Sequence, residues 1–176
     1  MSRIPLIRVE DMDPEQRAQY DRFPANLTRG LLLADLRLSQ ALPNLANALR
    51  AASLDAKMRE AVILRVAALH DNAYERMQHL EQARKVGWSG AEIAAIEAGQ
   101  FALLPADMAI GMQFADECVT QGNVSDETFA AAQAVLSQRD LATMILLVGH
   151  YMMVARFTAV LAIELDAQAD SWTHEH

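Results

Sequence analysis

The sequence predicts an all-α protein, folded as a single-domain bundle of about seven or eight helices. Alanine, leucine, glutamate and glutamine are abundant, whereas the 176 residues include only 7 glycines and 5 prolines, and this balance favours helices. Helix-capping residues recur just ahead of apolar stretches that repeat with helical spacing. No stretch shows the sustained apolar and polar alternation, rich in β-branched side chains, that predicts a strand.

Composition and charge exclude several functional classes. Hydrophobic residues make up 52% of the chain and charged residues 22%, which is typical of a globular protein. The net charge of −8 repels phosphate backbones and no basic stripe offsets it, so we expect no nucleic-acid binding. Cys118 is the only cysteine, so an intrachain disulfide, a CxxC redox pair and a cysteine-rich zinc cluster are excluded. Residues 1–10 lack the basic and apolar regions of a signal peptide, so we expect a cytoplasmic protein.

The first half of the chain contains clear helix starts. Residues 1–12 are expected to form an extended N-terminal arm of the single domain, which covers 1–176. Asp13, a capping residue followed by Pro14, predicts a helix that ends near Phe23. Further helices are predicted over Leu31–Leu38, from Pro43 to Ala51, from Asp55 to Leu69 and from Asn72 to Gly87.

The second half continues the pattern. Ser89, with Glu92 three residues later, forms a capping box. Helices are predicted from there to Ala98 and over Pro105–Gln121, Asp126–Leu136 and Gln138–Asp166, with 167–176 as a flexible tail. The most apolar stretch, Leu141–Ala155, is shorter than the roughly 20 residues that span a bilayer, so we expect a buried core helix and no membrane association.

The candidate site lies where the helical pattern is interrupted by the polar residues 70–72. Asn72 is expected to cap the helix that follows this interruption and runs to Gly87. The start of a helix offers free N–H groups and a partial positive charge, both of which favour anions. Glu75 and His79 are four residues apart and share one face of that helix. A carboxylate beside an imidazole is a common arrangement for proton transfer. Glu75 could instead serve only as the acid of a capping box, and His79 could be an ordinary structural histidine.

Three further residues are candidates with structural alternatives. Glu60 lies near the start of its helix, where an acid also favours the helix dipole. Tyr74 resembles a half-buried packing residue more than a proton donor. His150 lies in the most apolar helix, so it is either a buried histidine bonded to a carbonyl group or a residue that lines a cavity.

The central part of the chain resembles the carboxymuconolactone decarboxylase family, whose superfamily also contains the alkyl hydroperoxidase D proteins. The residues that carry the resemblance are Arg59-Glu60, Ile63–Ala67, Tyr74-Glu75, His79, Ala83-Arg84, Gly87 and Glu92-Ile93. Outside this core, Asp13–Arg17, Ser125–Phe129 and Val148–Met153 resemble the long branch of the family. The resemblance implies an all-α fold and assembly as a dimer, trimer or hexamer, with the site near a subunit boundary.

Compared with the peroxidase branch, this chain keeps the glutamate as Glu60 and the histidine as His79. Asn72 and Glu75 stand at the two cysteine positions of the CxxC motif. Thiol chemistry is therefore impossible at those positions, and a CxxC peroxidase is excluded. The decarboxylase branch resembles this chain in having a glutamate four residues before the histidine, which here is Glu75.

This resemblance implies a cofactor-free, metal-free lyase or isomerase acting on a small carboxylated or carbonyl compound. In that hypothesis His79 exchanges a proton with the substrate, Glu75 orients or charges it, and Glu60 completes the catalytic group. Substrate binding is assigned to Asn72, Tyr74 and His150. The alternative is a non-catalytic oligomer that binds a small ligand or a partner protein, and peroxide reduction through Cys118 is a remote third hypothesis.

Overall fold

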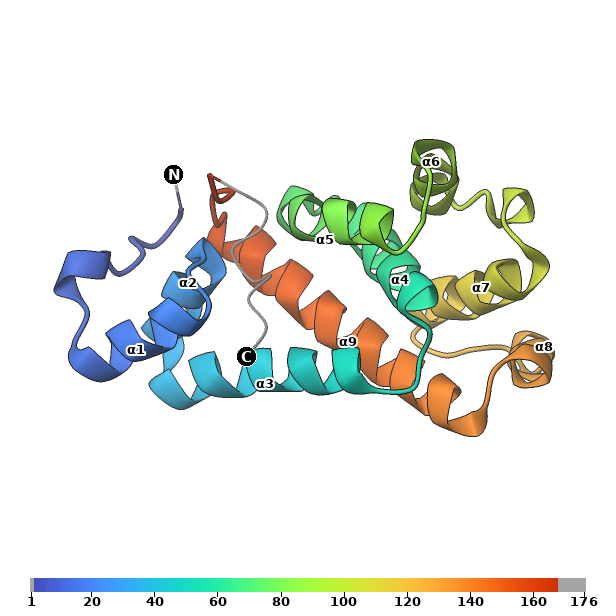
Figure 1. The fold of residues 1–176 in the computed structure, drawn as a ribbon, viewed down its shortest axis with the longest axis horizontal. Helices are drawn as coiled ribbons and strands as arrows, with labels where there is room; N and C mark the ends of the chain where they lie inside the picture. The colour runs from blue at the N-terminus through green and yellow to red at the C-terminus, as the bar shows by residue number, and fades with distance from the viewer. Residues whose placement is uncertain (1, 168–176) are drawn as a thin grey trace.

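Helix α4 occupies the centre of the fold, with α5, α6, α7 and α9 packed around it (Figure 1). The computed structural model describes residues 2–167, and within that range the chain forms nine α-helices and two short 3₁₀ turns, with no strand. The α-helices are α1 Pro14–Arg22, α2 Asn26–Ala34, α3 Leu36–Ala51, α4 Ala56–Leu69, α5 Ala73–Lys85, α6 Gly90–Ala98, α7 Ala106–Gln121, α8 Asp126–Val135 and α9 Gln138–Leu161. The all-α prediction is confirmed.

The side chains of α4 are buried on nearly every side. Val62 and Leu64 are fully buried, Ile63 and Val66 are 1% exposed, and all four belong to the main hydrophobic core. A helix whose apolar residues are buried on most of its faces is expected at the centre of a bundle. This central position makes α4 a rigid support for Glu60, the acidic residue buried within it.

Several helix starts were readable from local capping chemistry. The Asp13 side chain accepts the N–H groups of Glu15 and Gln16, and Ser89 forms its capping box with Glu92. Asn72 accepts the N–H of Glu75 at 2.8 Å and begins α5, as expected. These starts depend on residues at most three positions apart, which is why the sequence alone indicates them.

The prediction for residues 31–51 was wrong. Asp35, in extended conformation, ends α2 and caps α3 by accepting the N–H of Arg37. Pro43 does not begin a helix but lies inside α3, where it leaves the carbonyl of Ser39 without its helical N–H partner. That carbonyl instead accepts the side-chain amide of Gln19 at 2.7 Å, which holds α1 against α3.

The end of the last helix also differs from the prediction. Helix α9 stops at Leu161, because Ala162 adopts the left-handed conformation (φ 50°), and not at Asp166. The following residues turn back, so Asp166 accepts hydrogen bonds from Tyr74 and Gln78. The predicted tail lies outside the described residues except for residue 167. Residues 2–12 form no helix or strand apart from the 3₁₀ turn Val9–Asp11, and Arg8 and Met12 on either side of it are extended.

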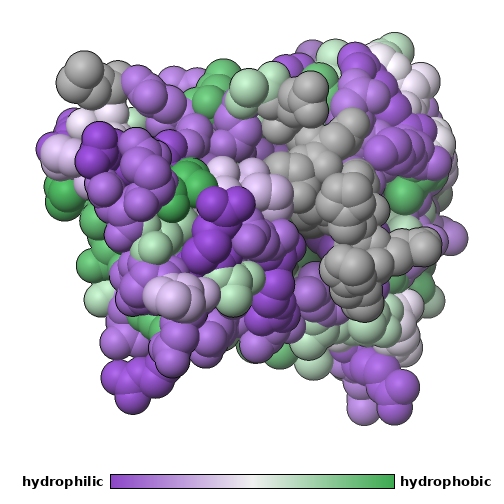
Figure 2. Space-filling view, turned by 60° about the vertical axis from the view of Figure 1, so that its left-hand side comes forward, coloured by the Kyte–Doolittle hydropathy of each residue, from purple (hydrophilic) through white to green (hydrophobic). Residues whose placement is uncertain are grey.

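Helix α9 is longer than the apolar stretch used to predict it. Over its 24 residues it contains a window of mean hydropathy 1.7, so by length and composition it could cross a membrane. The core helix of a soluble protein passes the same test, and α9 packs against α3, α4, α5, α7 and α8. The face of the molecule in Figure 2 is mostly hydrophilic, with hydrophobic residues in small separate groups.

Candidate functional site

A cavity of about 750 Å³ lies where α3, α5 and α9 meet, with further walls from α1, α2 and α4. Cavities of roughly 300–1,000 Å³ are the size that binds small molecules and cofactors. Exposed residues line part of the wall, among them Arg22, Asn47 and Lys85, so the cavity opens to solvent. Glu60, Glu75 and His79 all line it.

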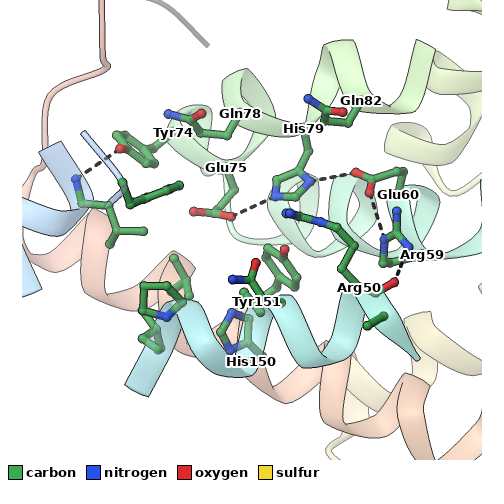
Figure 3. Close-up of a pocket in the computed structure, with 18 of the residues that line it drawn as sticks. Arg50, Arg59, Glu60, Tyr74, Glu75, Gln78, His79, Gln82, His150 and Tyr151 are labelled. Atoms are coloured by element: carbon green, nitrogen blue, oxygen red, sulfur yellow. Dashed lines mark hydrogen bonds and ion pairs between the residues drawn. The ribbon is translucent and has the colours of Figure 1, made fainter. Parts of the chain in front are cut away.

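The two glutamates lie on opposite sides of the His79 ring (Figure 3). Nδ1 of His79 is 2.8 Å from Oε2 of Glu60, and Nε2 is 3.9 Å from Oε2 of Glu75. All three side chains are at most 5% exposed. An ionised Glu60 can only accept, so the Nδ1–H of His79 donates to it and Nε2 faces Glu75.

The break between α4 and α5 places these residues together. Asp71 adopts a left-handed conformation (φ 47°), and Asn72 then begins α5, which packs along α4. The N–H of Asn72 donates to Ala67 at 2.8 Å, so the Glu75 carboxylate does not cap it. Glu75 is therefore not the acid of a capping box, and its carboxylate lines the cavity.

The two glutamates differ in acidity. Burial alone would raise the pKa of Glu60, but the charge and hydrogen bond of His79, together with Arg59, outweigh it and hold the pKa below its ordinary value. Burial raises the pKa of Glu75 to about 7, although the charge of His79 opposes the rise. Two nearby carboxyl groups whose pKa values are pushed apart are typical of acid–base sites.

This geometry changes the roles expected from sequence. Glu75 was expected to orient or charge His79, and at 3.9 Å the two groups are within ion-pair distance but too far apart for a hydrogen bond. Glu60, from the neighbouring helix, holds the ring instead. Glu75, which is protonated for part of the time at neutral pH, is the better proton donor to the cavity.

Sequence reasoning missed the cationic side of the site. Arg50, in the last turn of α3, extends toward His79 and lines the cavity, as Figure 3 shows. Burial lowers the pKa of Arg50, though a guanidinium stays charged at neutral pH. The Nε–H of Arg59 donates to Glu60 at 3.1 Å. Arg59 entered the sequence analysis only as part of the family resemblance, and Arg50 did not enter it, because nothing in the sequence places α3 beside His79.

Tyr151 was also missed. Its ring packs edge-on against His79, with ring centres 5.0 Å apart. Burial and the charges of Glu75 and Glu60 raise the pKa of the Tyr151 hydroxyl well above its ordinary value. The hydroxyl therefore stays protonated and can act only as a neutral hydrogen-bonding group.

Asn72 has a structural position. Its side-chain amide donates to the carbonyl of Ala155 at 2.9 Å and to Oγ1 of Thr158 at 2.8 Å, and it does not line the cavity. It joins α5 to α9 and is not placed to bind a substrate anion. Tyr74 lines the cavity, but its hydroxyl donates to Asp166 at 2.5 Å.

His150 lines the cavity and is 5% exposed. Its Nδ1 has no hydrogen-bond partner among residues 2–167, so no carbonyl group in that range bonds this atom. Burial, and then the charge of His79, lower the pKa of His150 to about 4. At neutral pH it is an uncharged imidazole with one unused polar atom.

The described residues offer neither a candidate metal site nor a thiol in the cavity lining. Within residues 2–167, no group of three or more histidine, cysteine, aspartate or glutamate side chains could hold a metal ion. Cys118 lies on α7, outside the cavity lining, and burial raises the pKa of its thiol. A raised pKa makes a thiol less reactive.

Comparison with known proteins gives one family match. The model of the carboxymuconolactone decarboxylase family matches residues 37–105, a segment that contains Glu60, Glu75, His79 and Arg50 but neither α1, α2 nor α9. No curated protein sequence matches the chain.

Solved structures show the same fold over nearly the whole chain. The alkylhydroperoxidase AhpD core from Ralstonia eutropha JMP134, an uncharacterized peroxidase-related protein, has a TM-score of 0.79 at 14% identity, covering 99% of this chain and 98% of that one. A peroxidase-related protein from Silicibacter sp. TM1040 has a TM-score of 0.80 at 15% identity, covering 96% and 95%. The debrominase Bmp8, in complex with 2,3,4-tribromopyrrole, has a TM-score of 0.75 at 12% identity, covering 98% and 97%. Such low identities establish a common fold and not a common activity.

Proposed function

We propose that the protein, whose residues 37–105 match the model of the carboxymuconolactone decarboxylase family, is a cofactor-free lyase or isomerase acting on a small carboxylated or carbonyl compound. One observation carries the proposal. Glu75 faces a cavity with a pKa raised to about 7, next to a histidine that a second, ionised glutamate holds in place. A group that titrates near neutral pH can both give and take a proton under working conditions.

In the proposed decarboxylation, the bond between the substrate carbon and its carboxylate breaks, and its electron pair passes into an enolate. Protonated Glu75 then gives its proton to that carbon. His79 then takes a proton from solvent at Nε2, Glu60 stabilises the resulting imidazolium, and the Nε2 proton passes to the Glu75 carboxylate, which restores both groups. For an isomerisation, Glu75 would take a proton from one carbon and return it to another, with no net proton change.

The cations of the cavity support an anionic substrate. Arg50 and Arg59 are positive, Glu60 is ionised, and burial favours the neutral form of Glu75. Fixed positive groups in a buried site stabilise an enolate as its charge develops. Arg50 lines the cavity and extends toward His79, so we assign it to the substrate carboxylate or enolate.

We extend the proposal to assembly and location. Helix α9 carries exposed apolar residues on its outer side, among them Ile145, Leu146, Met153 and Val160. A second copy of the chain covering this face would bury them, which supports a homo-oligomer. We propose a dimer, trimer or hexamer, and a cytoplasmic location. Light scattering of the purified protein would test this, with a monomer at micromolar concentration as the contradicting result.

Proton exchange in heavy water tests the enzymatic proposal. The protein would be incubated in D₂O with a panel of 2-oxo acids, 3-oxo acids and carboxylated lactones. NMR would then record loss of carbon dioxide, double-bond shifts and deuterium uptake at carbon. We expect turnover of at least one class, reduced about 100-fold or more by Glu75→Gln and His79→Gln and unchanged by Glu127→Gln, an exposed control.

Two outcomes would count against it. If neither variant slows the reaction that the wild-type protein catalyses, proton transfer does not depend on this group. If no compound in the panel is exchanged or converted, the cavity serves the alternative function, binding of a small ligand without catalysis.

A further inference from the structure

We propose that the substrate of this cavity is amphipathic, a carboxylate with a hydrophobic chain or ring of several carbons, and that its hydrophobic part lies against Phe23 and the apolar residues of α2, α3, α5 and α9. This inference deepens the proposed function, since it names a substrate class for the same cavity. It rests on a division of the cavity wall into a polar part and an apolar part.

The apolar part belongs to a second hydrophobic cluster, separate from the main core. Five cavity residues are members of this cluster or pack against it: Phe23, Leu27, Leu42, Tyr74 and Val154. Leu27 and Val154 are 8% and 2% exposed, so this wall is a preformed apolar surface and not a loose surface patch. The main core does not contain any of these five residues.

The polar part is the acid–base group with its cations. Figure 3 shows Glu60, Arg59 and Arg50 gathered on the side of His79 away from Tyr74. Along α5 the order is Tyr74, Glu75 and then His79, so the apolar wall begins beside the proposed proton donor. At about 1.5 Å of rise per residue, Tyr74 and His79 are about 7.5 Å apart along the helix axis. A ligand with its carboxylate near Arg50 therefore needs only a few carbons to reach the apolar wall.

The size of the cavity favours the same conclusion. About 750 Å³ is far more than a compound of a few heavy atoms fills. A small polar substrate would leave water against the apolar wall, where it finds few hydrogen-bonding partners. A hydrophobic chain that replaces this water gains affinity with each methylene group it buries.

The apolar wall is partly an addition to the family segment. Phe23, Leu27 and Val154 lie outside the matched residues 37–105, whereas the acid–base group lies inside them. Gln19 and Arg22 of α1 line the cavity next to Phe23. The acid–base group thus lies wholly inside the matched segment, whereas three of the five residues of the apolar wall lie outside it. We infer that these three residues help to determine which hydrophobic group is accepted.

A homologous series of straight-chain carboxylates tests this inference. Isothermal titration calorimetry would measure the dissociation constants of butanoate, hexanoate, octanoate and decanoate for the wild-type protein at pH 7. We expect binding to tighten by up to about fourfold for each added methylene until the apolar wall is covered. The matching alkylammonium ions should bind at least tenfold more weakly, because the cations near His79 select a negative head group.

Two variants test whether the apolar wall causes the dependence of affinity on chain length. Leu42→Trp places a bulky ring in the apolar wall and should remove the gain between hexanoate and decanoate. Leu38→Trp, one turn earlier on the same helix and 55% exposed, should leave the series unchanged. If Leu42→Trp fails to fold, Phe23→Ala serves as a second test of the apolar wall. It enlarges the cavity, so the chain length that binds most tightly should become longer.

Equal affinities across the series, or no measurable binding of any member, would overturn the inference. Measuring the same series on Glu75→Gln separates it from the proposed function, since binding requires no proton transfer. Chain-length dependence without turnover would refute only the enzymatic proposal. Turnover of small carboxylates without chain-length dependence would refute only the amphipathic substrate.

Discussion

Replacing Glu75 with glutamine should change how the stability of the protein depends on pH. The pKa of Glu75 is raised from 4.5 to about 7 because its charged form is buried. The folded protein therefore binds the Glu75 proton more tightly than the unfolded chain does. Stability from this group is fully present below pH 4.5 and is lost as the pH rises toward 7, by about 3 kcal/mol at roughly 1.4 kcal/mol for each pKa unit.

Glutamine keeps the shape of the side chain and cannot ionise. Glu75 makes no hydrogen bond through its carboxylate to His79, since the two atoms are 3.9 Å apart, so the substitution breaks no strong contact there. Urea unfolding at pH 5, 6, 7 and 8 should show the variant close to the wild-type protein at pH 5. Its advantage should then grow with pH, up to about 3 kcal/mol at pH 8.

Glu127→Gln is the matched control, because Glu127 is an exposed acid in the first turn of α8. Its difference from the wild-type protein should stay small and constant from pH 5 to pH 8. A constant difference for Glu75→Gln over the same range would refute the reasoning. It would mean that Glu75 has its ordinary pKa, near 4.5, and does not donate a proton at neutral pH.

Three further predictions concern buried polar groups. The pKa of His150 is lowered to about 4, so protonation of this side chain is unfavourable in the folded state and destabilises the wild-type protein as the pH falls from 6.5 to 4. In urea unfolding, His150→Phe should therefore gain up to about 3 kcal/mol over the wild-type protein across this range. No gain would contradict the prediction. Gln19→Ala should lower the unfolding free energy by about 1–3 kcal/mol, because it leaves the Ser39 carbonyl unpaired. The loss should be smaller in a Pro43→Ala background, where residue 43 again has an N–H to donate to that carbonyl. A double-mutant cycle with no coupling between the two positions would refute this account. Asn72→Ala should lower the unfolding free energy by about 2–4 kcal/mol through loss of a cap and two side-chain hydrogen bonds, and a change below about 0.5 kcal/mol would contradict the structural position assigned to it.

The sequence predicted the helices whose starts depend on neighbouring residues. Asp13 and Ser89 could be recognised as caps because the groups they bind lie within three positions. The path from residue 31 to residue 51 could not be predicted in this way. Pro43 is accommodated inside α3 by the amide of Gln19, a residue of another helix, and no local pattern reveals such a contact.

The same distinction applies to the candidate site. Spacing and the family resemblance selected Glu60, Glu75 and His79, and the structure places all three on one cavity. Spacing did not indicate which glutamate meets which nitrogen of the ring, because that depends on how α4 lies against α5. Arg50 was not selected, since only the packing of α3 over the cavity brings it to His79.

The ionisation of the Glu75 carboxyl group tests the central claim most directly. A ¹³C NMR titration of glutamate-labelled protein, with the signal assigned by its loss in Glu75→Gln, should give a midpoint near pH 7. In His79→Gln the midpoint should move higher still, because the charge of His79 lowers the pKa of Glu75 in the wild-type protein. A midpoint near 4.5 in the wild-type protein would contradict the claim that this carboxyl group delivers protons inside the cavity.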